Sequence, residues 1–249
     1  MKKSLKIIAL ACAVSFSVAS CDTLAQLPIS SLLNPTDGEI GSGLKEALNV
    51  GISNGVQSLM KTDGYFADQA LKILLPQEAQ EVQNLITKHI PGGQNLVNAA
   101  VLKMNRAAED AAKEALPIFA NAITSMNITD AKNILFGGTG AATTFLKDKT
   151  LQALTQAYAP KINASLSSVG AVQAWEAMVK PYNKLADSPA GMLIQGLKPV
   201  NADLGSHVTQ KALDGLFMKV RDKENGIRGN VGERTSPLLQ KVFGMLDKK

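Results

Sequence analysis

The sequence predicts an all-α fold, as a single multi-helix, bundle-like domain. Apolar residues recur about once per helical turn over most of the 249-residue chain, and no segment alternates apolar and polar residues as a strand would. Aromatic residues make up only 4% of the chain, while Ala, Leu, Gln and Lys, which lose little freedom in a helix, are common. We expect the helical domain to span residues 37–247.

Residues 1–20 have the pattern of a secretion signal. A basic start, Met1–Lys6, precedes an apolar run over residues 7–18, which falls short of the roughly 20 residues that a membrane-spanning helix needs. The run ends in Val18-Ala19-Ser20-Cys21, which resembles the lipobox where bacterial lipoproteins are cut before a lipidated cysteine. We therefore predict a cleaved lipoprotein signal peptide at residues 1–20 and a lipidated N-terminus and tether over residues 21–36.

Other interpretations of Cys21 have less support. A disulfide with Cys12 would join residues that cleavage separates, and cleavage before Cys12 would leave a very short apolar region with Ala9 at the aliphatic position. Ordinary signal cleavage and a cytosolic protein are the remaining alternatives. Acylation of Cys21 leaves no free thiol in the mature chain, which excludes cysteine catalysis and cysteine-based metal sites.

The N-terminal pattern predicts where the protein lies. We expect it in the bacterial cell envelope, anchored through the lipid on Cys21 and facing the periplasm. Asp22 resembles the inner-membrane retention signal of enteric-type bacteria, but that rule does not hold in all lineages, so the choice of membrane stays open.

The net charge gives little reason to expect a nucleic-acid partner. Lys2, Lys3 and Lys6 precede Cys21 and no acidic residue does, so loss of the signal peptide lowers the formal net charge from +5 to about +2. No basic patch with interleaved aromatic residues is present either.

The first predicted helix starts at Thr36 or Asp37 as its N-cap. Its apolar residues lie about one turn apart: Ile40, Leu44, Leu48, Ile52, Val56 and Leu59. A turn and a short helix are expected within residues 61–69. The next helix starts near Pro76 and ends before Pro91.

The rest of the chain reads as further helices divided by prolines and glycines. An alanine-rich helix is predicted over residues 94–126, kinked or divided by Pro117, and a short helix follows, capped by Thr129 and stopped by Gly137. The remaining predicted helices cover residues 141–158, 161–169, 171–186 and 203–223, with breaks at Pro160 and Pro181, and a last one after Thr235-Ser236-Pro237.

Several blocks resemble a known family. These are "GSGLKEAL", "DGYF", "MNRAAEDAAKEALPIFANAITSMNITDAKNIL", "GGTGAATTFLKDKT" and "VTQKALDGLFMKVRDKENGIRGNVGERTSPLLQKVFG". Most of the mature chain is thus similar to bacterial envelope lipoproteins that carry domain of unknown function 4197. The resemblance implies an all-helical secreted or lipid-anchored domain and no known activity. The chain departs from the family pattern at His207, where a tyrosine is expected, and at "DKENGIR", which replaces a more acidic pair before Arg228.

No motif specifies a catalytic or metal centre. "GGTGAAT" (137–143) invites a phosphate-loop interpretation, but it follows a helix and lacks the Gly-Lys-Ser/Thr ending, so a C-cap followed by an N-cap is favoured. His89 and His207 are the only histidines and lack HExxH spacing. We predict no cofactor and no metal.

The polar cluster in "MNRAAEDAAKEA" is the main candidate site. Arg106 lies three residues before Glu109 and four before Asp110, so it shares a helix face with either of them in a mostly alanine environment; Asn105 is its neighbour. One interpretation is a semi-buried charged site that Asp214 or Arg228 completes. The alternative, which we favour, is a salt bridge that fixes helix register.

Three hypotheses for function follow. The first is a non-enzymatic binding or scaffolding module with an envelope protein as partner. The second is a carrier that holds a small apolar or lipid ligand between helices, for which a cavity of several hundred Å³ would be needed. The third is an enzyme with an Arg/Glu/Asp cluster around Arg106, which requires those groups to meet in a solvent-reachable cleft.

Overall fold

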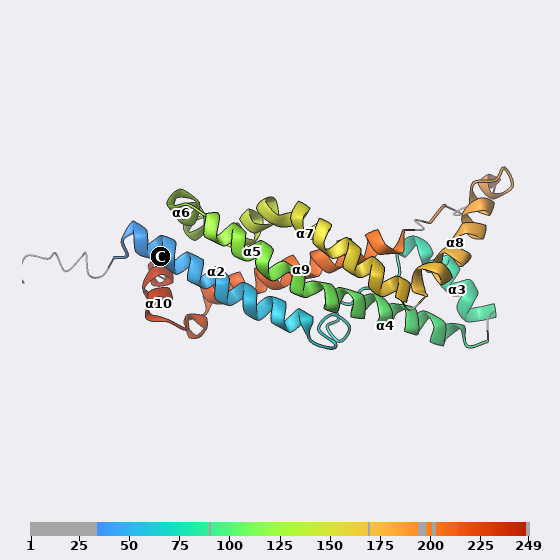
Figure 1. Cartoon of the computed structure of the whole chain (residues 1–249), viewed down its shortest axis with the longest axis horizontal. Coiled ribbons are helices and arrows are strands. Elements are labelled where there is room, and N and C mark those ends of the chain that lie inside the picture. Colours follow the sequence, from blue (N-terminus) through green and yellow to red (C-terminus); the bar gives the residue numbers. More distant parts are fainter. Residues whose placement is uncertain (1–33, 90, 169, 194–197, 201–202, 248–249) are drawn as a thin grey trace, which may run out of the picture.

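The computed structural model describes residues 34–89, 91–168, 170–193, 198–200 and 203–247. Every regular element in these ranges is helical, which confirms the all-α prediction (Figure 1). The α-helices are α2 (Asp37–Met60), α3 (Gln80–His89), α4 (Gly93–Ala111), α5 (Ala115–Ser125), α6 (Ile128–Phe136), α7 (Ala141–Ser168), α8 (Ala171–Ala186), α9 (Leu204–Gly229) and α10 (Pro237–Phe243). Short three-ten turns lie at 77–79, 112–114, 191–193, 231–233 and 244–246.

The longer helices run along an elongated body (Figure 1). Helix α9 packs along both α7 and α2, and α7 also packs along α4 and α5. The start of α2 lies at one end of the body together with α6 and α10, whereas α3 and α8 lie at the other end. The chain therefore enters the domain at the end opposite to α3.

Helix α2 forms as its sequence pattern predicts. Thr36 is the N-cap: its hydroxyl accepts a hydrogen bond from the Glu39 N–H (3.2 Å), and the Glu39 carboxylate accepts one from the Thr36 N–H (2.7 Å). The predicted apolar stripe is buried along its whole length. Gly43 has a steric role, because a Cβ there would lie 2.8 Å from the Val242 side chain of α10.

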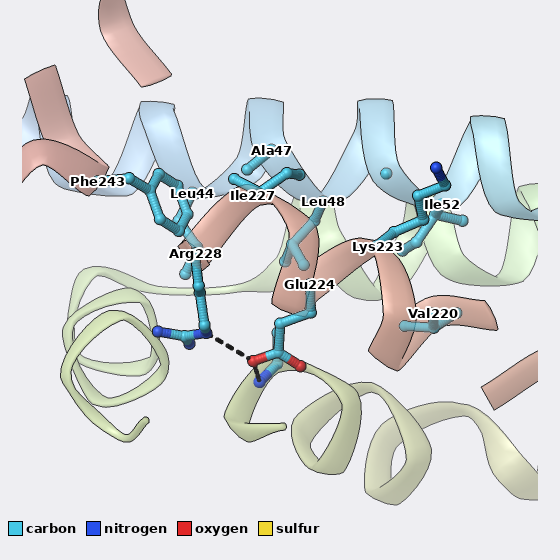
Figure 2. Close-up of a pocket in the computed structure, with 12 residues that line it drawn as sticks. Leu44, Ala47, Leu48, Ile52, Val220, Lys223, Glu224, Ile227, Arg228 and Phe243 are labelled. Atoms are coloured by element: carbon cyan, nitrogen blue, oxygen red, sulfur yellow. Dashed lines mark hydrogen bonds and ion pairs between the residues drawn. The ribbon is translucent and has the colours of Figure 1, made fainter. Parts of the chain in front are cut away.

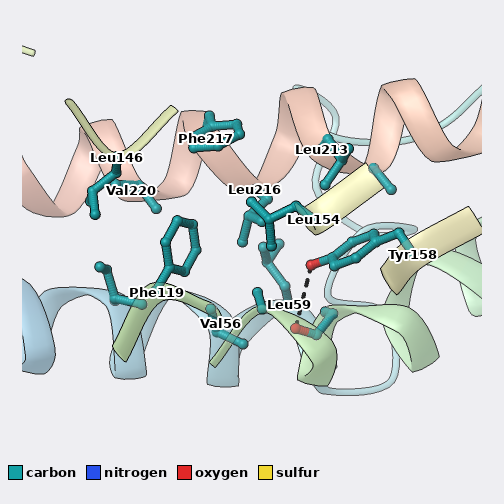
Figure 3. Close-up of a cluster of buried hydrophobic side chains, with 14 of the residues drawn as sticks. Val56, Leu59, Phe119, Leu146, Leu154, Tyr158, Leu213, Leu216, Phe217 and Val220 are labelled. Carbon is teal, nitrogen blue, oxygen red and sulfur yellow. Dashed lines mark hydrogen bonds between the residues drawn. The ribbon is translucent and has the colours of Figure 1, made fainter. Parts of the chain in front are cut away.

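In the centre of the body, side chains of α2, α5, α7 and α9 pack against one another (Figure 3). Phe119 of α5 and Phe217 of α9 meet edge to face with ring centroids 6.0 Å apart. Val56 of α2 is fully buried, as is Tyr158 of α7, whose hydroxyl donates to the Ala112 carbonyl at 3.4 Å. The packing of these side chains unites α2, α5, α7 and α9 in one core.

The prolines act differently from one another. Pro117 divides the predicted 94–126 helix as expected: α4 ends at Ala111, a three-ten turn follows, and α5 starts at Ala115. The predicted break at Pro160 is wrong, because α7 runs unbroken through it, and α8 likewise runs through residue 181. Pro160 lies on the exposed side of α7, while the helix stays buried on both sides of it at Tyr158 and Ile162. Burial of that face outweighs the one lost backbone hydrogen bond.

Three smaller expectations also change. The N-cap of α6 is Asn127, whose side chain accepts from the Asp130 N–H (2.8 Å), and Thr129 is already inside the helix. Residues 61–69 form successive turns in place of a short helix, with Asp63 in the left-handed region at φ 68°. Helix α9 continues to Gly229, beyond the predicted end at residue 223.

The predicted signal peptide, Cys21 and most of the predicted tether lie outside the described residues, so the N-terminal predictions stay predictions. Among the helices that the structure describes, none is both long enough and apolar enough to cross a membrane.

Candidate functional site

Asn105 fastens the loop that joins α2 to α3. The Asn105 side chain is fully buried; its Oδ1 accepts from the Ile73 N–H (2.9 Å) and its Nδ2 donates to the Ile73 carbonyl (2.8 Å). A second Nδ2 hydrogen bond reaches the Val101 carbonyl one turn back on α4 (2.7 Å). The amide therefore pairs with both backbone groups of one residue in a segment without regular secondary structure.

Glu109 and Arg106 secure the beginning of the same loop. Glu109 is 5% exposed, and its Oε1 accepts the N–H groups of Tyr65 (3.1 Å) and Phe66 (3.3 Å). Its Oε2 pairs with Arg106 Nη1 at 2.6 Å, and Arg106 Nη2 pairs with Asp63 at 2.7 Å. The hydrogen bonds that Arg106 donates to Glu109 and then to Asp63 raise the pKa of Arg106 above its ordinary value. The Arg106–Glu109 cluster is thus bonded within its own helix and to the loop.

Helix α9 holds the other side of the loop. The Tyr65 hydroxyl donates to the Ala212 carbonyl (2.8 Å), and His207 Nε2 lies 2.9 Å from the Leu74 carbonyl. Lys219 pairs with Asp68 at 2.8 Å, and this hydrogen bond lowers the pKa of Asp68. The loop is consequently clamped between α4 and α9.

The structure joins only part of the predicted polar site. Asn105, Arg106 and Glu109 act on one loop, which sequence spacing did not reveal because their partners lie 32 to 44 residues earlier. Asp214 is an exposed residue of α9, and Arg228 pairs with Glu224 (3.0 Å) further along that helix. Neither of them is bonded to Arg106.

Glu224 of α9 accepts hydrogen bonds from the end of the "GGTGAAT" segment, where α7 begins (Figure 2). Its carboxylate accepts the Ala142 N–H (3.0 Å), the Thr143 N–H (2.9 Å) and the Thr143 hydroxyl (2.7 Å) at the start of α7. Arg228, its partner, donates to the last carbonyls of α6, at Leu135 (2.9 Å) and Ile134 (2.6 Å). The anion thus sits at a helix N-terminus and the cation at a helix C-terminus, as the helix dipoles favour. The N–H groups that could bind a phosphate are already occupied by a carboxylate of the chain.

A large open groove lies beside the clamped loop, with a volume of about 890 Å³. Five of the described residues that line it have amide side chains, and we call it the amide groove: Gln77, Gln80, Gln83, Gln94 and Asn98. Apolar residues of the loop and of α4 line it too, among them Ile73, Val97 and Val101. Among the described residues that line it, the charged side chains are Lys72, Lys211 and Asp214, which are of both signs. Sequence reasoning missed this groove, because α3, α4 and α9 form it only after folding.

Two further hollows differ from the amide groove. A groove of about 390 Å³ runs between α7 and α9, lined by residues such as Leu151, Asn163 and Phe217. The hollow drawn in Figure 2, between α2 and α9, is mainly apolar and has a volume of about 20 Å³, which is room for about one water molecule. Across the described ranges, no three His, Cys, Asp or Glu side chains are grouped so that they could hold a metal ion.

Comparison with known proteins places the chain in a family. No curated protein and no solved structure matches it. A family model described as "Protein of unknown function (DUF4197)" matches residues 34–244, which is nearly all of the helical domain. The resemblance found in the sequence is therefore confirmed, and the chain belongs to the DUF4197 family.

Proposed function

We propose that this protein is a lipid-anchored binding module of the bacterial envelope, held to a membrane through Cys21, with the amide groove as its binding site. The observation that carries the proposal is the position of the groove. It lies among α3, the first turns of α4 and the first half of α9, toward the end of the body opposite to the start of α2 (Figure 1).

The length of the predicted tether lets the groove reach away from the membrane. Residues 22–33 at roughly 3.5 Å each would span at most about 40 Å, so the body can stand clear of the lipid surface. A site at the end of the body opposite to the start of α2 can then reach partners in the periplasm at a distance from the anchoring membrane.

The contacts support binding more than catalysis. An enzyme centred on Arg106 would need free acidic or basic groups in a cleft. Both terminal nitrogens of Arg106 donate hydrogen bonds to carboxylates. The two oxygens of Glu109 accept hydrogen bonds from the loop and from Arg106. The cluster therefore has a structural role, which is to hold the α2–α3 loop against α4.

The contacts also favour a groove over an internal carrier site. A carrier would need an apolar cavity of a few hundred Å³ between helices. The apolar hollow between α2 and α9 holds only about 20 Å³. The groove of about 390 Å³ between α7 and α9 has polar residues such as Asn163 and Thr209 in its lining, and the amide groove is larger than both.

Two measurements test the proposal. For the anchor, cells are labelled with a fatty-acid probe, and we expect labelled protein in wild type and none in Cys21→Ala; equal labelling would overturn the anchor. For the groove, a photo-crosslinking amino acid is placed at Gln80, or at exposed Gln152 of α7 as the matched control. We expect adducts in intact envelopes at position 80 alone. Equal yields at both positions would overturn the groove as the binding site.

A further inference from the structure

We propose that the amide groove binds a polypeptide in extended conformation and recognises it through its backbone. This inference rests on the proposed binding role of the groove and names the class of partner. It predicts that sequence matters less to the partner than an unfolded, extended stretch of chain.

The molecule already contains one contact of this kind. Asn105 binds both the N–H and the C=O of Ile73, and the non-helical segment around Ile73 borders the groove. A side-chain amide offers a donor and an acceptor side by side, which matches the N–H and C=O of a residue in an extended chain. Five side chains with the same amide group are among the described residues that line the groove.

The five amides stand on two helical segments. Gln77, Gln80 and Gln83 recur every three residues across the start of α3, while Gln94 and Asn98 lie one turn apart on α4. Gln94 Nε2 donates to Asn98 Oδ1 at 2.9 Å, which orients both amides. A chain lying between the two segments would meet donors and acceptors from each.

Apolar contacts complete the fit. Val97 and Val101 are buried, while Leu74 is 60% exposed and Met218 is 42% exposed, and all four line the groove. Alternate side chains of an extended peptide point to opposite faces, so every second one would rest on these residues.

The charges on the described residues that line the groove favour a neutral partner backbone over a charged polymer. Lys72 Nζ already lies 4.1 Å from the centre of the Phe66 ring, and Lys211 is followed by Asp214 one turn later. A groove built for a polyanion would carry an excess of cations, as nucleic-acid sites do.

The test uses the mature, lipidated chain in nanodiscs and a phage library of random linear nonapeptides. We expect the library to yield binders.

The strongest binder is then synthesised with a fluorophore and with single N-methyl groups along its backbone. Methylation at one alternating set of residues should weaken binding about tenfold, because it removes a backbone donor, while the other set is tolerated. The paired change Gln80→Ala and Gln94→Ala should weaken binding by at least as much with an unchanged melting temperature, and Gln152→Ala should have no effect.

Several results would overturn the inference. One is a library that yields no binder, and another is a binder that tolerates N-methylation at every position. Adducts at position 80 that resist proteinase K and contain glycan or lipid would also overturn the peptide class, yet they would leave the groove as the binding site. Failure of crosslinking at position 80 would instead remove the proposed function itself.

Discussion

Asn105 holds Ile73 by both its backbone N–H and its backbone carbonyl, 32 residues away in the chain, at 2.9 and 2.8 Å. This pair decides how the α2–α3 loop lies, because the loop has no regular secondary structure in which to place its own peptide groups. A helix side chain supplies the pairing that a β-strand would otherwise give. The wall of the amide groove depends on that arrangement.

Replacing Asn105 should destabilise the whole domain. Asn105→Ala leaves a buried N–H and a buried C=O of Ile73 without partners, and an unmade buried hydrogen bond costs about 1–3 kcal/mol. We expect a loss of about 3 kcal/mol in the free energy of unfolding, measured by urea denaturation. Asn95→Ala, at an exposed position of α4, should change it by less than about 0.5 kcal/mol. A loss at Asn105 as small as that at Asn95 would contradict the account.

Glu109 should matter more to stability than Arg106, its ion-pair partner. Glu109→Ala removes the acceptor of two loop N–H groups and leaves the guanidinium with only Asp63, so we expect a loss of about 3 kcal/mol. The Arg106 side chain is 35% exposed, and Arg106→Ala should cost about 1 kcal/mol. Urea denaturation of both variants provides the comparison. Equal losses, or the reverse order, would mean that the ion pair and not the loop N–H groups sets the energetics.

Local patterns in the sequence were enough to predict most helices. The stripe from Ile40 to Leu59 and the Thr36 cap place α2, because period and cap are properties of neighbouring residues. The same reasoning failed at Pro160, where the outcome depends on which face of α7 is buried by other helices. It also chose Thr129 as a cap, although Asn127 stands three residues before Asp130, in the spacing of a reciprocal cap.

The candidate site was predictable only where its members share a helix. Arg106 and Glu109 stand three residues apart, so their pairing follows from helix geometry. Other contacts join residues that are 32 to 82 positions apart in the chain, namely those of Asp63, Ile73 and Glu224. Such contacts depend on how the helices are aligned along one another in the folded domain. The amide groove has the same origin, since three helices meet there.

Acid should weaken the fastening between α2 and α10. The hydrogen bond from Lys241, then that from the Thr36 backbone, lowers the pKa of Glu39 to about 2 from an ordinary value of 4.5. A carboxylate whose pKa is depressed by folding contributes stability above its unfolded pKa and loses it as the pH falls toward the folded value. The melting temperature of wild type should therefore exceed that of Glu39→Gln at pH 6, with the gap closing between pH 4.5 and 2.

Thermal melts by circular dichroism at several pH values measure that gap. Asp148→Asn, at an exposed position of α7, is the control and should follow wild type throughout. A gap between wild type and Glu39→Gln that stays constant down to pH 2 would show that the Glu39 charge contributes nothing to folding.

Removing Glu224 should turn the start of α7 into an anion site. Glu224 is 8% exposed, and Glu224→Ala leaves the N–H groups of Ala142 and Thr143 open and Arg228 without its ion-pair partner. We expect a loss of about 3–5 kcal/mol in the free energy of unfolding. Inorganic phosphate at millimolar concentration should restore part of it, because a helix N-terminus beside an arginine binds anions.

Two further variants test whether the phosphate effect depends on the loss of the Glu224 carboxylate. Glu224→Gln keeps one acceptor oxygen for the α7 N–H groups, so it should lose less stability and respond less to phosphate. Asp222→Ala, at an exposed position two residues earlier on α9, should behave as wild type. Differential scanning fluorimetry with and without phosphate, at constant ionic strength, measures the shift for each variant. If phosphate stabilises wild type and Glu224→Ala equally, the Glu224 carboxylate is not what occupies the N-terminus of α7 in solution.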